Sequence, residues 1–367
     1  MAAFSAARML TGCPFPERVI DGGTCDRRRG AKTVRMSVAS DAGTSKYEEG
    51  NLALPKWAGK SPLARLLGTL ISFKPFYSVL KQGARDVLIS TAEKNNIPWR
   101  AMTKEILHSD VYMEFETIRD PSLVYPDYYL NPFHAYEDGN LSWLAAAEVE
   151  AATLSLFVRA IPEASSKEEA SLVIRGNWLK AIRQHLERHS GNLAVNDILD
   201  IGCSVGISTN HLADAFPSAH VTGLDLSPYF LSVAKHKEKK RAPRKNPIRW
   251  IHANGEATGL PSKSFDLVSF ALVLHECPVR ATVNLLEESM RLLRPGGTLV
   301  VMDQAPESKV IQDLPPVLFT VVKSTEPFLD EYYLLDLKKA IEDAGFLNVS
   351  LGLTDPRHRT VTASAPY

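Results

Sequence analysis

The sequence predicts an α/β fold in which helices cover both faces of a doubly wound, mostly parallel sheet, with a helical region in front of it. From Asp197 onward, short apolar runs alternate with helical patterns, which is typical of such a sheet. The first run, 197–201, is followed by a turn with two glycines and then by a helical pattern from about 207 to 215. A strand, a glycine turn and a helix in this order form the place where open α/β sheets bind nucleotides.

Composition fits this fold and argues against several other classes of protein. Hydrophobic residues make up 45% of the 367 residues, and 42 Lys and Arg balance 42 Asp and Glu, so no overall charge favours nucleic acid. The nearest candidate for a membrane span, Leu66–Phe73, is interrupted by Gly68 and Thr69 and is far shorter than the roughly 18 residues of a membrane-spanning helix. The cysteines have neither zinc-site spacing nor a CxxC pair, so no metal site or disulfide framework is expected; they are Cys13, Cys25, Cys203 and Cys277.

Residues 1–40 are expected to be a transit peptide that is removed after import. The segment is rich in small residues and arginine, and it lacks the apolar core of a secretory signal. The sequence VRMS at 34–37 resembles a plastid processing site, which predicts a chloroplast location, in the stroma or at a thylakoid or plastoglobule surface. Three acidic residues keep a mitochondrial leader and plain disorder open as alternatives: Glu17, Asp21 and Asp26.

Residues 46–165 are expected to form the helical N-terminal region. Leucines recur at three- and four-residue spacing in Ser61–Glu93, with basic residues between them. This helix either docks on the catalytic domain or rests on an anionic membrane surface. An aromatic stretch at 125–136, interrupted by prolines, precedes a second predicted helix at Ser142–Ile161.

The catalytic domain is expected to span residues 170–367. A polar break at Pro162–Glu169 precedes a predicted helix at Leu172–His189, and the alternating strands and helices follow it. The remaining apolar runs are expected to supply the other strands of the sheet. We therefore expect the helical region and the catalytic domain to meet near residues 165–170.

The glycine turn discriminates between two classes of cofactor. A dinucleotide fingerprint that starts at Gly202 would need glycine at positions 204 and 207, where Ser204 and Ile207 stand. The strand also ends with an acid, Asp200, which would repel a pyrophosphate. S-adenosylmethionine (SAM) has an α-amino group, a sulfonium and no phosphate, so an anion at this point favours SAM.

The run DIGCSVGIST at 200–209 resembles the first motif of the class I SAM-dependent methyltransferases, although many members have glycine where Ser204 stands. Further stretches resemble the later stations of this Rossmann-like fold, in order: 221–227, 251–256, 264–276, 293–304, and a reversed C-terminal hairpin at 347–353 and 359–365. The resemblance covers about residue 196 to the end. Five ordered stations make it far more specific than any one motif.

The resemblance implies which residues bind SAM. In it, Asp225 takes both ribose hydroxyls and Asn254 contacts adenine. The full implied set is Asp200, Gly202, Cys203, Ser204, Gly206, Asp225, Leu226, Asn254, Gly255 and Glu256. The pattern is most similar to the ubiquinone and menaquinone C-methyltransferases, especially plant and cyanobacterial plastid-type relatives with a long N-terminal extension. This similarity implies a small, phenolic or quinone-like methyl acceptor.

Sheet topology places the acceptor beyond the ends of the fourth and fifth strands, near His275, Glu276, Asp303 and Gln304. His275 is the candidate catalytic base, because histidine titrates near neutral pH. The alternative is that His275 packs on the cofactor or bonds to the backbone. The aromatic stretch 125–136 is expected to cover the acceptor together with Lys323–Tyr333, or else to join the two regions only.

Other interpretations remain open at this point. Asp225 could merely cap the next helix, Asn254 could be a turn residue, and the two glycines could serve only a tight turn. The basic run Lys235–Lys245 is either a solvated loop or a contact to protein or RNA, which would make the chain a macromolecular methyltransferase. A SAM-binding scaffold without turnover is the third function that the sequence allows.

Overall fold

The computed structural model describes residues 47–51, 55, 85–86, 88–134, 136–191, 194–315 and 325–367. The expected transit peptide at 1–40 and most of the expected helix at 61–93 lie outside the described residues, so their roles stay predictions. None of the helices in the described ranges is long and apolar enough to cross a membrane.

Seven strands form one sheet in the order β3-β2-β1-β4-β5-β7-β6. The strands are β1 (Asp197–Ile201), β2 (His220–Asp225), β3 (Arg249–His252), β4 (Phe265–Ala271), β5 (Leu293–Gln304), β6 (Leu347–Leu353) and β7 (His358–Ser364). β1 to β5 pair in parallel, whereas β7 runs antiparallel to both of its neighbours. This topology confirms the predicted doubly wound sheet with a reversed C-terminal hairpin.

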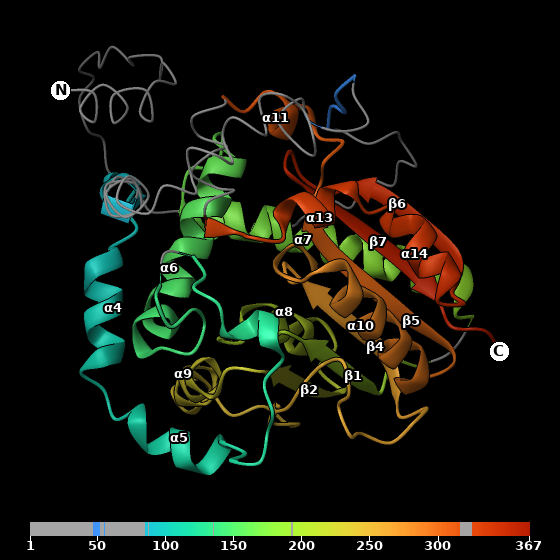
Figure 1. The fold of residues 1–367 in the computed structure, drawn as a ribbon, viewed down its shortest axis with the longest axis horizontal. Coiled ribbons are helices and arrows are strands. Elements are labelled where there is room, and N and C mark those ends of the chain that lie inside the picture. Colours follow the sequence, from blue (N-terminus) through green and yellow to red (C-terminus); the bar gives the residue numbers. More distant parts are fainter. Residues whose placement is uncertain are drawn as a thin grey trace, which may run out of the picture.

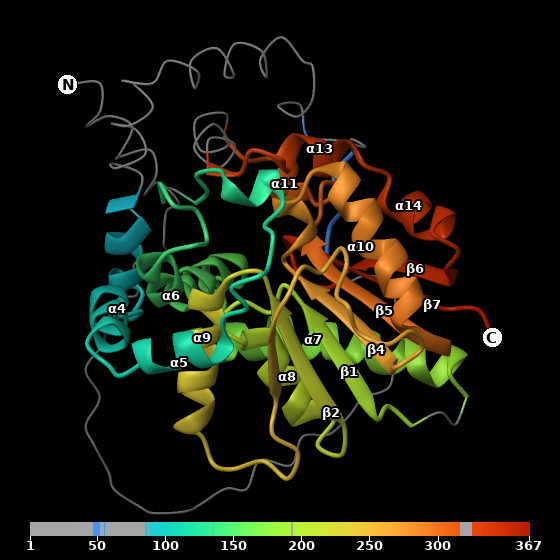
Figure 2. The same cartoon turned by 60° about the horizontal axis from the view of Figure 1, so that its bottom comes forward.

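Helices cover both faces of the sheet (Figure 1), with α7 and α8 on one face and α10 and α14 on the other. The longer helices are α4 (Trp99–Leu107), α5 (Tyr112–Ile118), α6 (Trp143–Ala160), α7 (Lys167–His189), α8 (Ile207–Ala215), α9 (Pro228–Lys239), α10 (Val279–Leu292) and α14 (Leu337–Asp343). The shorter ones are α11 (Lys309–Gln312), α13 (Leu329–Leu334) and the 3₁₀ turns η1 (Asp127–Leu130) and η2 (Leu274–Glu276). Of the N-terminal helices, α5 and α6 pack against α9, and α4 packs against α6 (Figure 2).

Alternate side chains of the strands enter two different cores. Ile198 packs with residues of α6, α7 and α8, whereas the next residue, Leu199, packs with α10, α13 and α14. This alternation follows from the two-residue period of a strand. Phe157 of α6 lies in the same core as Ile198, so the helical region shares its core with the sheet.

The two long helices begin at serine caps. Ser142 accepts a hydrogen bond from the amide of Ala145, which starts α6 within one residue of its predicted boundary. Ser166 likewise accepts from the amide of Glu169, so α7 starts at Lys167, inside the stretch predicted to be a polar break. A polar first turn is compatible with a helix when a serine caps it, because the side chain satisfies an otherwise unpaired amide.

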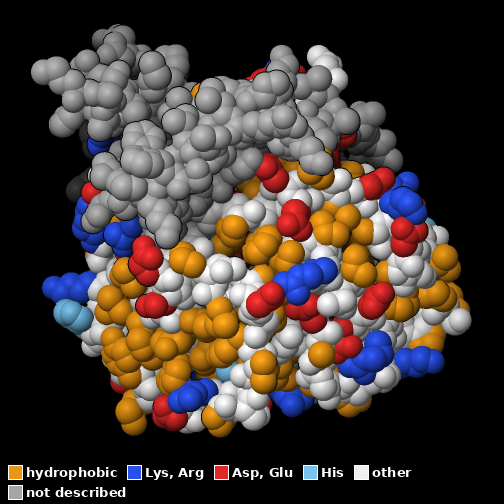
Figure 3. All heavy atoms as spheres, viewed as in Figure 1, with side chains coloured by type: hydrophobic (Ala, Val, Ile, Leu, Met, Phe, Trp, Pro, Cys, Tyr) orange, Lys and Arg blue, Asp and Glu red, His pale blue; other side chains and the backbone are white. Residues whose placement is uncertain are grey.

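Apolar side chains gather on one face of the molecule, over α5 and beside α9 (Figure 3). Tyr112 and Met113 of α5 are 44% and 74% exposed, and the ring of Tyr112 packs edge-on against that of Trp143. Phe115 and Tyr229 join the same group of rings.

Candidate functional site

The glycine turn between β1 and α8 has a backbone that few residues other than glycine adopt. Gly202, Ser204 and Gly206 have φ values of 69°, 51° and 81°. The amides of Gly202 and Cys203 both donate to the carbonyl of Leu224 on β2, which fixes the turn to the neighbouring strand. The positive φ at Ser204 explains why glycine is common there in related motifs; serine tolerates this region at some cost in strain.

Asp200 is fully buried between β1 and α8. Its Oδ2 atom accepts hydrogen bonds from the hydroxyls of Ser208 and Thr209, both at 2.7 Å. Burial raises the pKa of this carboxyl, and the hydroxyl donors oppose that shift. Asp200 therefore holds the first turn of α8 against the strand, directly behind the glycine turn.

Asp225 ends β2 and faces the same turn. Its two carboxylate oxygens accept from the amides of Ser204 and Ser227, both at 2.7 Å. Burial raises its pKa to about 6, and the two amide donors, with a hydrogen bond from Tyr129, oppose that rise. Ser227 caps α9 through its own hydroxyl, which accepts from Phe230. Asp225 is thus more than a helix cap: it joins the glycine turn to the start of α9.

Residues 254–256, which follow β3, form a tight turn. Asn254 accepts from the amide of Glu256 at 2.9 Å, so it is a turn residue whose carbonyl oxygen retains a second lone pair. Gly255 is required by packing, because a Cβ there would lie 2.6 Å from Ile201. The carbonyl of Leu226 accepts a hydrogen bond from the His252 ring.

The aromatic segment, residues 125–136, crosses the carboxyl ends of the strands. It rises from α5 toward α13 in Figure 2. The hydroxyl of Tyr128 donates to Glu256 at 2.8 Å, and that of Tyr125 lies 3.2 Å from His252. With Tyr129 beside Asp225, the segment contacts the ends of both β2 and β3.

The aromatic segment also contacts residues 325–333, the described part of the stretch Lys323–Tyr333 that is expected to cover the acceptor with it. The rings of Tyr128 and Phe328 pack edge-on with centroids 6.0 Å apart, and the amide of His134 donates to the carbonyl of Thr325 at 3.0 Å. A cavity of about 540 Å³ lies between these two segments and the start of α10. It is lined by Asp127, Tyr128, Asn131, Pro278, Arg280, Phe328 and Glu331.

The donor set around the glycine turn fits SAM better than a dinucleotide. Asp200 and Asp225 both flank the turn, and the hydrogen bonds they accept from described residues come from hydroxyls and backbone amides rather than from a basic side chain. A pyrophosphate would approach the carboxylate of Asp225 with the buried Asp200 directly behind the turn, whereas an ammonium, a sulfonium and ribose hydroxyls suit two acids at this point. The residues present therefore fit the predicted cofactor.

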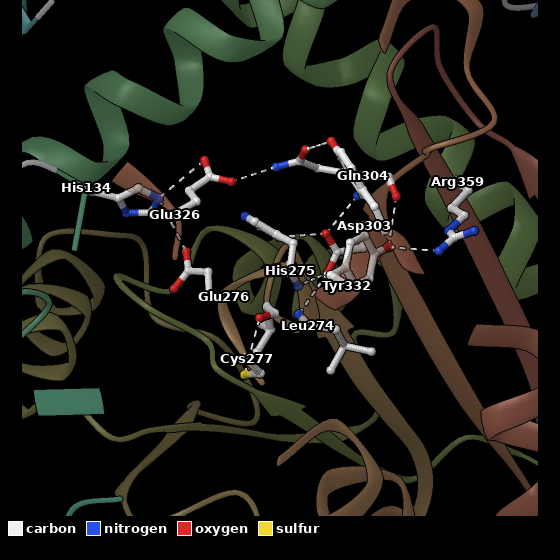
Figure 4. Close-up of polar contacts among 12 residues, drawn as sticks. His134, Leu274, His275, Glu276, Cys277, Asp303, Gln304, Glu326, Tyr332 and Arg359 are labelled. Atoms are coloured by element: carbon white, nitrogen blue, oxygen red, sulfur yellow. Dashed lines mark hydrogen bonds and ion pairs between the residues drawn. The ribbon is translucent and has the colours of Figure 1, made fainter. Parts of the chain in front are cut away.

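His275 lies in a second group of ionisable residues, beyond the ends of β4 and β5 (Figure 4). Its Nδ1 atom is 2.6 Å from Oδ1 of Asp303, which is completely buried. Burial alone lowers the pKa of His275, but the charge and hydrogen bond of Asp303 outweigh burial and raise it to about 10. At neutral pH His275 is therefore a cation, which donates hydrogen bonds rather than accepting a proton.

Three further ionisable side chains surround the free side of the His275 ring. His134, at the tip of a tight turn with φ 48°, places its Nε2 3.8 Å from Oε1 of Glu276 and 3.8 Å from Oε1 of Glu326. Burial raises the pKa of both glutamates, to about 8 for Glu276. Glu326 was not predicted from the sequence, where it follows the polar residues 323–325 and no local pattern distinguishes it.

Gln304 and the tyrosines of α13 complete this side of the site. The hydroxyl of Tyr333 donates to Oε1 of Gln304, and that of Tyr332 donates to the Gln304 carbonyl at 2.8 Å. The Gln304 amide group in turn donates to Glu326 at 3.3 Å. The described His, Cys, Asp and Glu side chains form no group that could hold a metal ion.

The basic run Lys235–Lys245 is largely neutralised by carboxylates. Lys235 and Lys239 both pair with Glu114 of α5, and Arg244 pairs with Glu238 and Asp214. The other paired bases of the run are Lys237, Lys240 and Arg241. This pairing favours the solvated-surface interpretation over a contact to nucleic acid.

Comparison with known proteins agrees with this geometry. A methyltransferase domain family matches residues 199–301, which include the glycine turn and β1 to β5. Demethylmenaquinone methyltransferases of Lactococcus lactis and Tropheryma whipplei are 32% and 30% identical over 154 and 190 residues, or 41% and 47% of this chain. The chain spans 58% of the length of the first relative and 74% of the second.

Among solved structures, the CurJ carbon methyltransferase aligns with 65% of this chain and 66% of its own, at 17% identity and a TM-score of 0.46. The sheet order, the fitted cofactor station and the relatives identify the family. The chain belongs to the class I SAM-dependent methyltransferases, in the family that includes the bacterial demethylmenaquinone methyltransferases.

Proposed function

We propose that this protein transfers a methyl group from SAM to a small phenolic or quinone-like acceptor. The observation that carries the proposal is the group formed by His134, His275, Glu276 and Glu326. Asp225 of the cofactor site is close enough for its charge to act on Glu276, and the rings of Phe133 and Tyr332 pack against His134 and His275. Acidic and basic groups that face one another suit an acceptor hydroxyl, while aromatic walls suit a flat ring. The names of the bacterial relatives support the same class of acceptor.

The chain's own residues divide the work of binding. When bound, SAM supplies an electrophilic methyl group, whose bond to sulfur breaks with the electron pair left on sulfur. Asp225 would hold the ribose hydroxyls, the backbone of Gly202–Gly206 would let the cofactor approach closely, and Asn254 would contact adenine. The acceptor would bind beyond the ends of β4 and β5, beside the methyl group of SAM. Holding the two reactants in this orientation is expected to supply much of the rate enhancement.

Incubation with SAM labelled in its methyl group tests the reaction. Label is expected in a soluble 1,4-naphthalenediol and not in the corresponding quinone, because only the reduced ring is electron-rich. Label that entered protein or RNA instead would favour the macromolecular alternative, which the neutralised basic run does not support. Tight SAM binding without label transfer to any acceptor would favour the scaffold alternative.

Tyr128→Ala is expected to weaken acceptor use without disturbing the cofactor. Tyr128 lines the cavity and packs on Phe328, and the loss of one aromatic contact raises the acceptor KM by about 3- to 10-fold. Steady-state kinetics give the KM, while calorimetry with SAM and the melting temperature are expected to hold. Tyr112→Ala, an exposed tyrosine on α5, is the control. Loss of several degrees of stability together with poor SAM binding would instead show that the aromatic segment only joins the two regions.

We propose that residues 1–40 direct the protein into plastids, with cleavage near Met36. The arginine-rich leader without a secretory apolar core supports this location. A fluorescent protein fused to residues 1–60 is expected to enter plastids and to lose the leader there. A cytosolic, mitochondrial or secreted reporter would contradict the proposal.

A further inference from the structure

Four side chains from three separate segments converge beyond β4 and β5 (Figure 4). His275 and Glu276 belong to η2, Glu326 precedes α13, and His134 is carried by the aromatic segment. The two distances of 3.8 Å from His134 to the glutamates exceed a hydrogen bond. His134 therefore makes no direct hydrogen bond to either glutamate, although all three side chains lie close together.

Part of this group is accessible although it lies beneath the aromatic segment. The side chains of His134 and Glu276 are 36% and 26% exposed, whereas those of His275 and Asp303 are 7% and 0% exposed. The His275 Nδ1 atom is used by Asp303, and its Nε2 atom has no hydrogen-bond partner among the described residues. In Figure 4 the ring of His275 lies between Asp303 and the two glutamates, so Nε2 is directed toward them.

His275 is held by a firmly anchored partner, Asp303, whereas Glu276 is held by a single long hydrogen bond. Asp303 also accepts from the amides of Leu274 and Gln304, at 2.8 Å and 2.7 Å, which keeps it ionised and opposite the His275 ring. The Glu276 carboxylate accepts one hydrogen bond from the described residues, from the side chain of Asn140 at 3.3 Å. The charged groups that act on Glu276 are His275, Glu326, Asp225 and Asp303, and burial acts more strongly than any of them. His275 is thus a fixed cation, and Glu276 is a weakly held carboxyl group beside it.

We propose that His275 and Glu276, covered by His134, bind a hydroxyl group of an aromatic acceptor, with Glu276 taking up the hydroxyl proton and His275 holding the resulting oxyanion; this inference rests on the proposed function. The acceptor O–H bond breaks, its electron pair stays on oxygen, and the proton forms an O–H bond on Glu276. The oxyanion enriches the neighbouring ring carbons in electrons. The carbon that receives the methyl group then loses its own proton, and Glu276 returns its proton to the oxygen. One proton is released for each methyl group transferred.

His134 covers the carboxylates of Glu276 and Glu326. Its turn is closed by backbone hydrogen bonds between Phe133 and Tyr136, and its own amide is fixed to Thr325. The imidazole therefore reaches the two glutamates from a backbone that is held at both ends. Burial of part of the ring and the positive charge of His275 lower the pKa of His134. A neutral His134 restricts the access of solvent to the glutamates and does not compete with His275 for the oxyanion.

The ionisation of a bound phenol tests the proposal without any methyl transfer. The probe is 2-naphthol, whose neutral and ionised forms absorb at different wavelengths, added to full-length protein that is saturated with demethylated SAM. We expect the bound probe to be ionised at a pH at least one unit below that needed in free solution. His275→Asn and Glu276→Gln are expected to abolish this shift, whereas Glu276→Asp retains part of it.

Controls separate this inference from the proposed function. Glu116→Gln, which changes an exposed acid on α5, is expected to behave as wild type, and calorimetry with demethylated SAM verifies that every variant is folded. A probe that binds the wild type but stays neutral would overturn the proton transfer and leave the phenolic acceptor intact. A protein that binds demethylated SAM but neither 2-naphthol nor 1,4-naphthalenediol would overturn the acceptor class and this inference with it.

Discussion

Asp303→Asn is expected to lower turnover by about 100- to 10,000-fold, the usual range for loss of a positioned acid–base group. Asp303 is the carboxylate that keeps His275 protonated and its ring oriented, through a contact of 2.6 Å. An asparagine amide cannot stabilise the imidazolium, so the pKa of His275 falls well below about 10. The neutral ring then loses its hold on an acceptor oxyanion.

The pH dependence of turnover shows whether the loss of activity in Asp303→Asn comes from the deprotonation of His275. Turnover requires an ionised Glu276 and a protonated His275, so the wild type is expected to be most active between about pH 8 and about pH 10. The acidic limb reports the group containing Glu276, and the alkaline limb reports His275. In Asp303→Asn the alkaline limb moves to lower pH. A variant that kept the wild-type turnover and alkaline limb would show that His275 does not act as a cation.

A second buried pair provides the matched control. Asp355 and His358 are also completely buried and 2.8 Å apart, in the turn before β7, and neither contacts His275. Removal of one partner of such a pair destabilises a protein by roughly 3–5 kcal/mol. Asp355→Asn is therefore expected to lower the melting temperature as Asp303→Asn does, while the turnover of its folded fraction stays near wild type.

Asp225→Ala is expected to weaken SAM binding by about 30- to 1000-fold, or roughly 2–4 kcal/mol, the scale of hydrogen bonds to a charged group. The substitution removes the proposed acceptor of both ribose hydroxyls. It also releases the amides of Ser204 and Ser227, which the carboxylate holds at 2.7 Å. Isothermal titration calorimetry with SAM measures the loss.

Asp214→Ala is the control for this variant, because Asp214 is a largely exposed acid near the end of α8 that pairs with Arg241 and Arg244. It changes the net charge equally but leaves the glycine turn untouched. Unchanged SAM affinity in Asp225→Ala would remove Asp225 from the site. Tight binding of NADH to the wild type would overturn the cofactor assignment itself.

Local patterns predicted the fold well. The first strand at 197–201 and α8 at 207–215 were both predicted within a residue, because apolar alternation and paired glycines are signals carried by neighbouring residues. The start of α7 was missed, since its first turn is polar and only the Ser166 cap identifies it.

The site was less predictable where it depends on distant segments. The contacts of His134 with Glu276 and Glu326, and of Tyr128 with Glu256, join parts of the chain that only the folded sheet brings together. Residue type alone also suggested the wrong protonation state for His275: an isolated histidine titrates near neutral pH, and the buried Asp303 changes that.

β7 lies between β5 and β6 in the sheet although it follows both of them along the chain. During synthesis on the ribosome, residues 358–364 emerge after both of their partners. Until then β5 and β6 each present an unpaired backbone edge, the kind of surface on which chains aggregate. The nascent protein is therefore most vulnerable just before β7 emerges, which makes chaperone protection most valuable at that moment.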